Sequence, residues 1–200
     1  MFERMQKNSR NLDKFRNQGV TILELTVVMA IVMIIATMAI PAALTVAREL
    51  RTSGDARDLN GAIVLAKMRA AANFARARVY ADLSANTFRV EWQQPGTTTW
   101  TPEGGDQYLA TGVSFGYGSL GTPPPNTQGT FGQALCSGST TTACITFNSR
   151  GIPIDSSGVP TSNDAIYVTD GRTVTGVTVS ATGLTKIWRT EASTANWKQK

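Results

Sequence analysis

A long run without charged residues, opened by a single glutamate, limits the possible folds of this sequence more than any other feature. The 23 residues of Leu25–Ala47 carry no charge. At about 1.5 Å per residue, a helix of this length extends about 34 Å, enough to cross a hydrocarbon core of about 30 Å. Glu24 precedes the run, and a carboxylate in an apolar span costs about 2.5–3.5 kcal/mol on insertion scales. The run therefore predicts a membrane-spanning helix. The costly carboxylate at its start indicates that Glu24 is a functional residue.

The residues around Glu24 resemble the type IV prepilin motif. Gly19–Glu24 reads Gly-Val-Thr-Ile-Leu-Glu and leads directly into the apolar run. The resemblance implies that a prepilin peptidase cuts between Gly19 and Val20 and that Val20 is then N-methylated. Glu24, the fifth residue after the cut, would act in assembly, and Pro41 stands where pilin-like helices usually carry a proline. The sequence departs from the motif at Val20, where the family usually has Phe.

Two other membrane-targeting segments are the alternatives to this interpretation. A cleaved secretory signal has an apolar region of about 7–15 residues and a small-residue cleavage site after it. This run is longer, and its processing signal lies before it. An ordinary signal anchor has no use for Glu24. We therefore expect the apolar segment to stay on the mature protein.

The charge of the first residues predicts the topology. The whole chain has a net charge of +5, and the segment before Gly19 has five basic and two acidic residues, a balance of +3 that leaves +2 for the mature chain. Basic residues ahead of a first span favour a cytoplasmic N-terminus. We therefore expect a single-pass protein of the bacterial inner membrane with a periplasmic C-terminal head. The leader residues are Glu3, Arg4, Lys7, Arg10, Asp13, Lys14 and Arg16.

The two cysteines, Cys136 and Cys144, lie in a segment rich in Gly, Ser and Thr. Thiols are oxidised on the periplasmic side of the membrane, so a disulfide that closes this loop is the favoured interpretation. Loop closure over so few residues contributes about 2–3 kcal/mol. Metal binding is the alternative, but the chain has no histidine, and two thiolates alone do not complete a zinc site.

Hydrophobic periodicity predicts one helix from about Val20 to Arg78, and whether it is interrupted near Gly54 stays open. Pro41 removes a backbone donor and predicts a kink near Thr37. Beyond Gly54 an apolar stripe recurs at steps of three and four, which predicts a face that packs on a sheet. The stripe comprises Leu59, Ile63, Ala66, Ala70 and Phe74. Lys67, Arg69, Arg76 and Arg78 occupy other faces, and the arginines are expected on a solvated helix face.

After residue 78 the period changes to two, typical of strands. Short hairpins are expected at 84–86, 170–171 and 182–183, and residues 94–106 and 118–142 are expected to be long loops. In the strand that begins at Val174, a bulge is expected at Gly176. A long N-terminal helix packed on antiparallel sheets defines an α+β, pilin-like fold. The candidate strands are Val79–Leu83, Thr87–Trp92, Tyr108–Leu109 with Val113–Tyr117, Cys144–Phe147, Ala165–Thr169, Val174–Ser180 and Leu184–Arg189.

Within the pilin-like class, the chain most resembles the GspH/FimT family. The likeness rests on Ala62–Arg78 running into Val79–Trp92, on Ile145–Pro153, and on the closing hairpins of Gly171–Arg189. It covers nearly the whole mature chain. The resemblance implies a leader at 1–19, an assembly helix at 20–47, its periplasmic continuation at 48–78 and a β-rich head at 79–200.

No set of residues predicts catalysis, a cofactor or a metal. Without histidine there is no imidazole base and no Ser-His-Asp triad. The carboxylates are expected mostly at turns, where Asp caps the backbone. We therefore expect a structural protein and not an enzyme. These carboxylates are Asp82, Glu91, Glu103, Asp106, Asp155, Asp164 and Asp170.

Basic residues near the C-terminus suggest a second hypothesis, that the chain binds nucleic acid. Some minor pilins related to FimT bind DNA through such residues, although the clustered Gly-Arg-x-Arg element is absent here. Spread charges could give weak, salt-sensitive contacts with phosphates, and a solvated tail is the simpler interpretation. The candidates are Arg172, Lys186, Arg189, Lys198 and Lys200, with Trp188 and Trp197 among them.

Three functional hypotheses follow from the resemblance. The first is a minor pseudopilin in the filament of a type II secretion system. The second is a minor type IV pilin in pilus biogenesis, and the third is a DNA-binding pilin in uptake. The expected partners are other pilins or pseudopilins, the prepilin peptidase, an inner-membrane assembly platform and membrane lipid.

Overall fold

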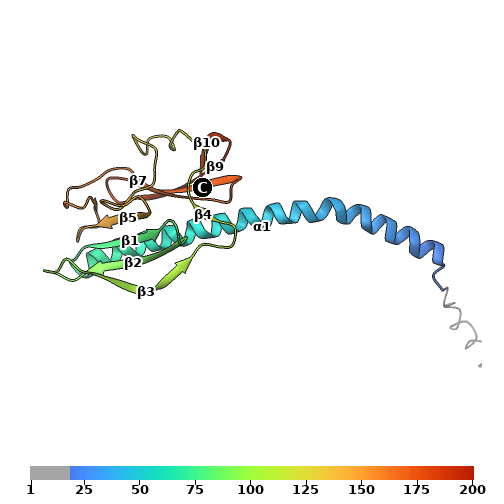
Figure 1. Ribbon diagram of the computed structural model, residues 1–200, viewed down its shortest axis with the longest axis horizontal. Coiled ribbons are helices and arrows are strands. Elements are labelled where there is room, and N and C mark those ends of the chain that lie inside the picture. The colour runs from blue at the N-terminus through green and yellow to red at the C-terminus, as the bar shows by residue number, and fades with distance from the viewer. Residues whose placement is uncertain (1–18) are drawn as a thin grey trace, which may run out of the picture. The chain divides into compact units, whose positions relative to one another are not determined.

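The computed structural model of the protein describes residues 19–200, which form one helix followed by ten strands (Figure 1). Residues 1–18 of the predicted leader lie outside the described residues. The chain divides into two units at Leu44 and Thr45. Helix α1 (Ile22–Ala72) begins in the first unit and ends in the second, which we call the head. The predicted α+β class, a long N-terminal helix with antiparallel sheets, is confirmed.

Helix α1 ends earlier than the sequence predicted. It runs without interruption through Gly54 to Ala72, whereas the prediction extended to Arg78. Phe74 has a φ of 50°, and the amides of Phe74 and Ala75 donate to the carbonyls of Ala71 and Ala70. This is a Schellman cap, whose left-handed residue is usually glycine. The apolar periodicity continued past this cap, so the helix end could not be read from it.

The head contains two five-stranded antiparallel sheets. Sheet A has the strand order β3-β2-β1-β5-β6, and sheet B has the order β10-β9-β8-β7-β4. The strands of sheet A are β1 (Ala77–Asp82), β2 (Thr87–Gln93), β3 (Trp100–Tyr108), β5 (Thr142–Phe147) and β6 (Pro153–Ile154). The strands of sheet B are β4 (Ser114–Phe115), β7 (Asp164–Thr169), β8 (Thr173–Val179), β9 (Thr185–Glu191) and β10 (Thr194–Gln199).

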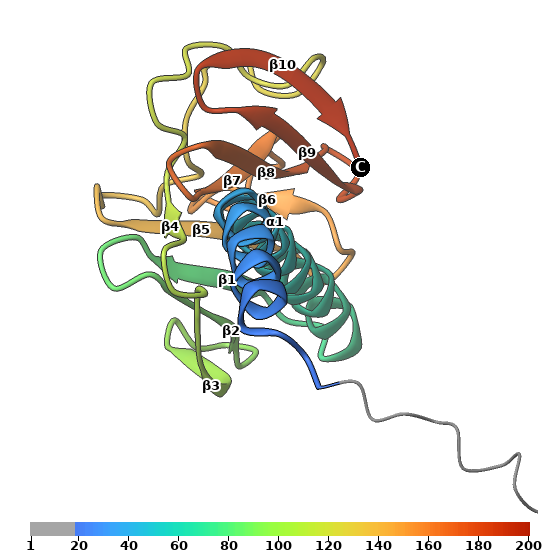
Figure 2. The ribbon, with the colours of Figure 1, turned by 90° about the vertical axis from the view of Figure 1, so that its right-hand side faces the viewer.

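The main core lies between the C-terminal half of α1 and the inner faces of both sheets (Figure 2). The predicted helix stripe is buried from Leu59 to Ala70, but Phe74 is 82% exposed, so that prediction was wrong. The fully buried partners include Val79 of β1, Ile145 of β5 and Val177 of β8.

A second cluster of side chains lies on the outer face of sheet B. Tyr167 of β7 is fully buried, and its hydroxyl donates to Gln128 Oε1 at 2.6 Å. The rings of Tyr117, Phe131 and Trp197 lie 5.9, 5.0 and 5.8 Å from the Tyr167 ring, centroid to centroid. This cluster fastens the long loop before β5 and the last strand onto the sheet.

Gly176 has a different role from the predicted bulge. It pairs in register with Tyr167 on one side and Trp188 on the other, without a register shift. A Cβ at this position would lie 2.5 Å from Cε1 of Tyr167. The glycine is therefore required because the tyrosine ring occupies the space of a side chain.

The hairpin turns are in place, but three strands were missed. Turns connect β1 to β2, β7 to β8 and β8 to β9, as predicted. Residues 94–106 were expected to be a loop, yet most of them belong to β3. Its Pro102 and Gly104 are tolerated because β3 is an edge strand with a register shift against β2. Strand β10 was mistaken for a tail, and β6 is only two residues long.

Candidate functional site

The start of α1 is capped by Thr21. Its Oγ1 accepts a hydrogen bond from the amide of Glu24 at 3.1 Å, and its carbonyl accepts one from the amide of Leu25 at 3.0 Å. Thr-x-x-Glu is the pattern of a capping box, in which Glu24 occupies the third helical position. A carboxylate in the first turn is also favoured by the helix dipole. The cap therefore fixes where Glu24 lies on the helix.

The apolar half of α1 exposes its side chains in the part of the chain that the structure describes. None of residues 19–44 is buried, and large side chains such as Ile22, Met38 and Ile40 are 60–83% exposed. The hydroxyls of Thr26 and Thr37 donate to the carbonyls of Leu23 and Ile34, at 2.8 and 2.7 Å. These two hydroxyls are thus satisfied within the helix, as a hydrocarbon environment requires.

Pro41 lies inside α1, and the helix continues through it. The predicted kink near Thr37 stays a prediction. Among residues 19–200, α1 is the one helix that is long and apolar enough to cross a membrane.

Comparison of the chain with known protein families identifies a motif in this segment. Residues 14–40 match the family model of the prokaryotic N-terminal methylation motif. The chain carries a type IV prepilin motif. This confirms the resemblance inferred from Gly19, Glu24 and the apolar run. Together with the apolar half of α1, the motif indicates a membrane-anchored, pilin-like protein. Residues 14–18 of the match lie outside the described residues.

One similar solved structure is the minor pseudopilin EpsH from the type 2 secretion system of Vibrio cholerae. The two chains are 13% identical, with a TM-score of 0.44, and the similarity covers 68% of this chain and 95% of that chain. No curated protein matches the sequence.

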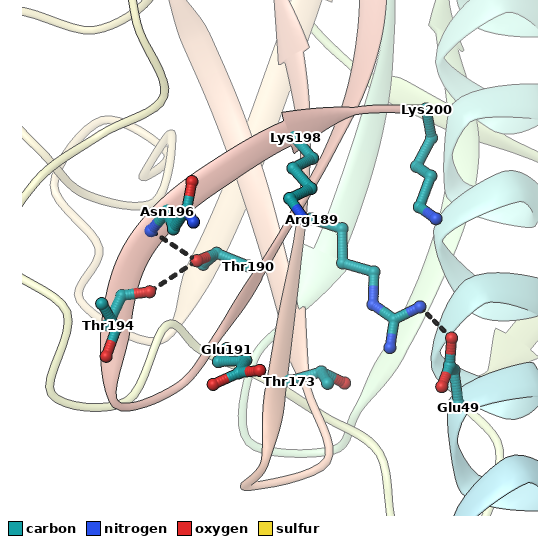
Figure 3. A pocket seen from close by; sticks show the side chains of 9 residues that line it. All are labelled: Glu49, Thr173, Arg189, Thr190, Glu191, Thr194, Asn196, Lys198 and Lys200. Carbon is teal, nitrogen blue, oxygen red and sulfur yellow. Dashed lines mark hydrogen bonds and ion pairs between the residues drawn. The ribbon is translucent and has the colours of Figure 1, made fainter.

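The five candidate nucleic-acid contacts do not lie on one surface. Arg189 and Lys198 are cross-strand partners on β9 and β10, and Lys200 lies near them beside α1 (Figure 3). Lys186 lies on the opposite face of β9, 6.0 Å from the ring of Trp188. Arg172 is in the turn between β7 and β8.

Arg189 is already engaged within the chain. Its Nη1 forms an ion pair with Oε1 of Glu49 on α1, which closes a contact between residues 140 apart (Figure 3). The hydrogen bond and charge of Arg189 lower the pKa of the Glu49 carboxyl. The positive charge of Arg189, Lys198 and Lys200 is thus partly neutralised by Glu49. The same ion pair fastens the C-terminal hairpin to the helix.

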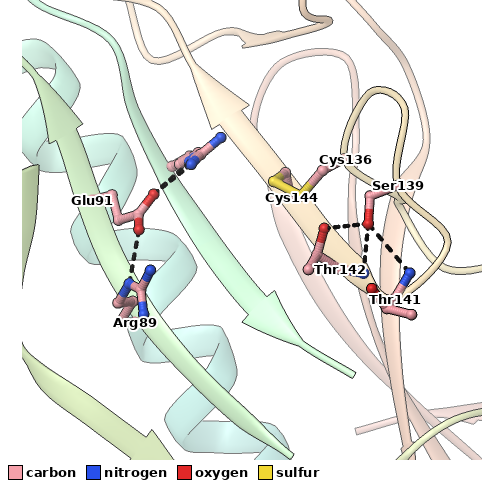
Figure 4. The surroundings of a disulfide bond; sticks show 8 residues. Arg89, Glu91, Cys136, Ser139, Thr141, Thr142 and Cys144 are labelled. Carbon is pink, nitrogen blue, oxygen red and sulfur yellow. Dashed lines mark hydrogen bonds and ion pairs between the residues drawn. A yellow bond between two sulfur atoms is a disulfide. The ribbon is translucent and has the colours of Figure 1, made fainter. Parts of the chain in front are cut away.

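The structure pairs Cys136 with Cys144, as predicted (Figure 4). Cys144 lies on β5 and Cys136 on the preceding loop, whose backbone also bonds to that strand. Ser139 Oγ accepts hydrogen bonds from the amides of Thr141 and Thr142 and from the hydroxyl of Thr142, at 3.2, 3.1 and 2.7 Å. The disulfide and the serine therefore fix a tight loop against sheet A.

Sequence reasoning missed an ionic network on the outer face of sheet A. Arg78 and Arg89 pair with opposite oxygens of Glu91, at 2.6 and 2.7 Å, and the Glu91 side chain is only 4% exposed. Arg89 also pairs with Asp106 at 3.0 Å, and Arg78 lies 4.1 Å from the ring centroid of Trp100. The available signal was the alternation of charged and apolar residues in β2, where Arg89 and Glu91 flank Val90. The part of Arg78 was hidden because that residue was assigned to the helix.

The other charged residues divide between turns and strands. Asp82, Asp155 and Asp170 accept hydrogen bonds from backbone amides in turns, as predicted. Glu103 instead lies on β3 and pairs with Arg69 of α1. The predicted solvated helix face was wrong at two of the arginines, because Arg76 lies beyond the end of α1 and Arg78 lies on β1. The part-buried Lys67 of α1 donates from Nζ to the carbonyl of Gly183 at 2.9 Å. Within residues 19–200, no group of His, Cys, Asp or Glu is arranged to hold a metal ion.

Proposed function

We propose that this chain is a minor pseudopilin of the GspH/FimT type, a structural subunit of the periplasmic filament of a type II secretion system. One observation carries the proposal. The prokaryotic methylation motif lies on a helix whose large apolar side chains from Ile22 to Leu44 are all at least half exposed among residues 19–200. Such a surface is stable in lipid and, after extraction, only against other helices of the same kind. The subunit would be structural and not an enzyme.

Processing would occur between Gly19 and Val20. Helix α1 begins at Ile22, so the bond lies just before the helix, and Val20 is 70% exposed. A peptidase needs an accessible bond outside a regular helix, and Gly19 and Val20 are exposed and lie outside α1. Cleavage would release a leader of residues 1–19 and leave a new amine on Val20, which would then be methylated.

Glu24 would pair with the Val20 amine of a neighbouring subunit. An isolated carboxylate among packed apolar helices is costly, and a paired one is far less so. The Thr21 cap fixes Glu24 one turn into the helix. Pairing between neighbours would therefore stabilise one axial register of the assembling helices over the others. The competing interpretations are a pair within one chain and a protonated carboxyl in lipid.

Anchoring by the apolar half of α1 would also set the topology of the rest of the chain. The N-terminus would be cytoplasmic, residues 20–47 would occupy the membrane and later the filament axis, and the head would be periplasmic. Residues 48–72 continue α1 into the head, which would contact neighbouring subunits and the inner-membrane assembly platform.

The first experiment is the intact mass and N-terminal sequence of the protein extracted from membranes. A chain that begins at Val20, with or without one methyl group, is the expected result. A chain that begins at Met1 would refute processing, because Val20 would then have no free amine to pair with Glu24.

The pairing of Glu24 needs a second experiment. Glu24→Val should abolish incorporation into filaments sheared from cells, while Glu24→Asp, the matched control, should retain part of it because the charge is kept. The amount of membrane-inserted subunit must be equal in both. Equal incorporation of both variants would contradict a role for the charge.

A minor type IV pilin is the second candidate, because the methylation motif is common to both systems. Deletion of the gene distinguishes them. Loss of secreted proteins with pili intact supports the secretion filament, and loss of surface pili with secretion intact supports the pilus. DNA binding in uptake would be a further property of the second candidate, with Arg172, Lys186, Arg189, Lys198 and Lys200 as contacts.

A further inference from the structure

Six basic side chains gather at the end of the head where α1 enters it. We call them the base patch. They come from the first turns of α1 in the head, from the turn between β7 and β8, and from the C-terminal hairpin. The base patch comprises Arg48, Arg51, Arg172, Arg189, Lys198 and Lys200. All except Arg189 are exposed.

Contacts within the head bring these elements together. Arg189 pairs with Glu49, and the charges of Lys200 and Asp170 also act on the Glu49 carboxyl, whose pKa the Arg189 hydrogen bond lowers. The turn that carries Asp170 and Arg172 therefore lies near the same carboxylate. Between them is an open cavity of about 520 Å³, with Lys198 and Lys200 on its wall (Figure 3).

The base patch is the positive pole of the mature chain. Residues 20–200 contain 14 basic and 12 acidic residues, a net charge of +2. Three acidic residues, Glu49, Asp170 and Glu191, lie among the six basic residues of the patch, so its net charge is +3. The remainder of the mature chain therefore has a net charge of −1.

The covalent chain fixes where this pole lies relative to the membrane. Arg48 is the first charged residue after the apolar run that ends at Ala47. Arg51 follows within one helical turn, and its Nη1 donates to the carbonyl of Thr111. The base patch thus surrounds the first turns of α1 beyond the membrane-spanning segment. Attraction between exposed charges and a charged lipid surface extends over about one Debye length, 8–10 Å.

We propose that the base patch docks on the anionic phospholipid headgroups of the membrane face from which the head emerges. Lys and Arg near such a surface each gain about 1 kcal/mol, an attraction that salt screens. The docked head would hold one orientation above the membrane while the subunit waits for assembly. The inference rests on membrane anchoring and holds for either filament.

The test uses the full-length chain in lipid nanodiscs. Ser193 lies exposed in the turn between β9 and β10, and both native cysteines are paired, so Ser193→Cys offers one labelling site. A fluorophore on that site transfers energy to an acceptor on lipid headgroups. Transfer is compared between phosphatidylcholine nanodiscs and nanodiscs with about one third phosphatidylglycerol, at low and high salt.

We expect greater transfer in the anionic nanodiscs and its loss in high salt. The double variant Lys198→Gln/Lys200→Gln should weaken docking about fivefold for each side chain removed, about 25-fold in all. Arg76→Gln/Arg150→Gln removes the same charge from two exposed positions outside the base patch and should leave docking unchanged. Equal circular dichroism of both variants verifies folding.

Two results would overturn the proposal. The first is equal transfer in zwitterionic and anionic nanodiscs. The second is equal loss of docking in both double variants, because that would mean a nonspecific effect of net charge. A short DNA duplex is added as a further arm. If it binds in a salt-sensitive way that needs Lys198 and Lys200, while anionic lipid has no effect, the patch is a nucleic-acid surface instead.

Discussion

Replacement of Gly176 by alanine is expected to destabilise the head by about 1–3 kcal/mol, the usual cost of an overpacked core. The added Cβ would lie 2.5 Å from Cε1 and 2.6 Å from Cδ1 of Tyr167, whereas carbon atoms pack at about 3.5–4.0 Å. The ring would have to move by about 1 Å. It has little freedom to do so, because its hydroxyl is bonded to Gln128 and the side chain of Gln133 bonds to both the amide and the carbonyl of Tyr167.

The assay is urea unfolding of the full-length chain in detergent, followed by tryptophan fluorescence, to which Trp188 and Trp197 of sheet B contribute. Gly61→Ala is the matched control. Gly61 lies in the exposed part of α1, and a Cβ there meets nothing within 4 Å. Alanine in a helix is favoured over glycine by about 0.5–1 kcal/mol, so the control should raise stability.

A double-mutant cycle isolates the steric term. Tyr167→Leu alone should destabilise by leaving a cavity. In the Tyr167→Leu background, Gly176→Ala should cost much less than in the parent, because the ring that it meets is gone. If Gly176→Ala alone left the unfolding midpoint unchanged, or if its cost were the same in both backgrounds, the packing argument would be refuted.

Three further predictions concern stability. Phe74→Gly should stabilise the head by about 1 kcal/mol in the same assay, because Phe74 is 82% exposed and holds a left-handed φ of 50° that glycine adopts freely. Reduction of the Cys136–Cys144 disulfide should destabilise by about 2–3 kcal/mol, and thiol labelling of the unreduced protein should find no free cysteine. Burial raises the pKa of Asp164, against an opposing hydrogen bond from Thr161. The folded state thus holds that proton more tightly than the unfolded state, and stability falls as pH rises from about 4. Asp164→Asn should therefore be more stable than the parent at pH 7, and the difference should shrink toward pH 4 in pH-resolved urea titrations.

The sequence alone determined the membrane segment and the class of the fold. The apolar run, Glu24 and the glycine before it are local in the chain, so composition and spacing define them without any tertiary contact. The same holds for the buried stripe from Leu59 to Ala70, whose helical period is a direct consequence of helix geometry. The hairpin turns at Gly171 and Gly183 were also predictable, because their left-handed conformations favour glycine.

Only the tertiary structure decided the rest, because it depends on pairs of residues far apart in the sequence. Gly176 was predicted to bulge, yet Tyr167, nine residues away on the neighbouring strand, explains it. Glu91 was predicted to lie on the strand Thr87–Trp92, but nothing local in the sequence indicated that it is buried between the arginines of two strands. The tail basic residues were predicted as one set. Strand alternation placed Lys186 on the opposite face from Arg189, whose partner Glu49 lies 140 residues earlier. A local pattern fixes which face a residue occupies, and only packing determines what meets it there.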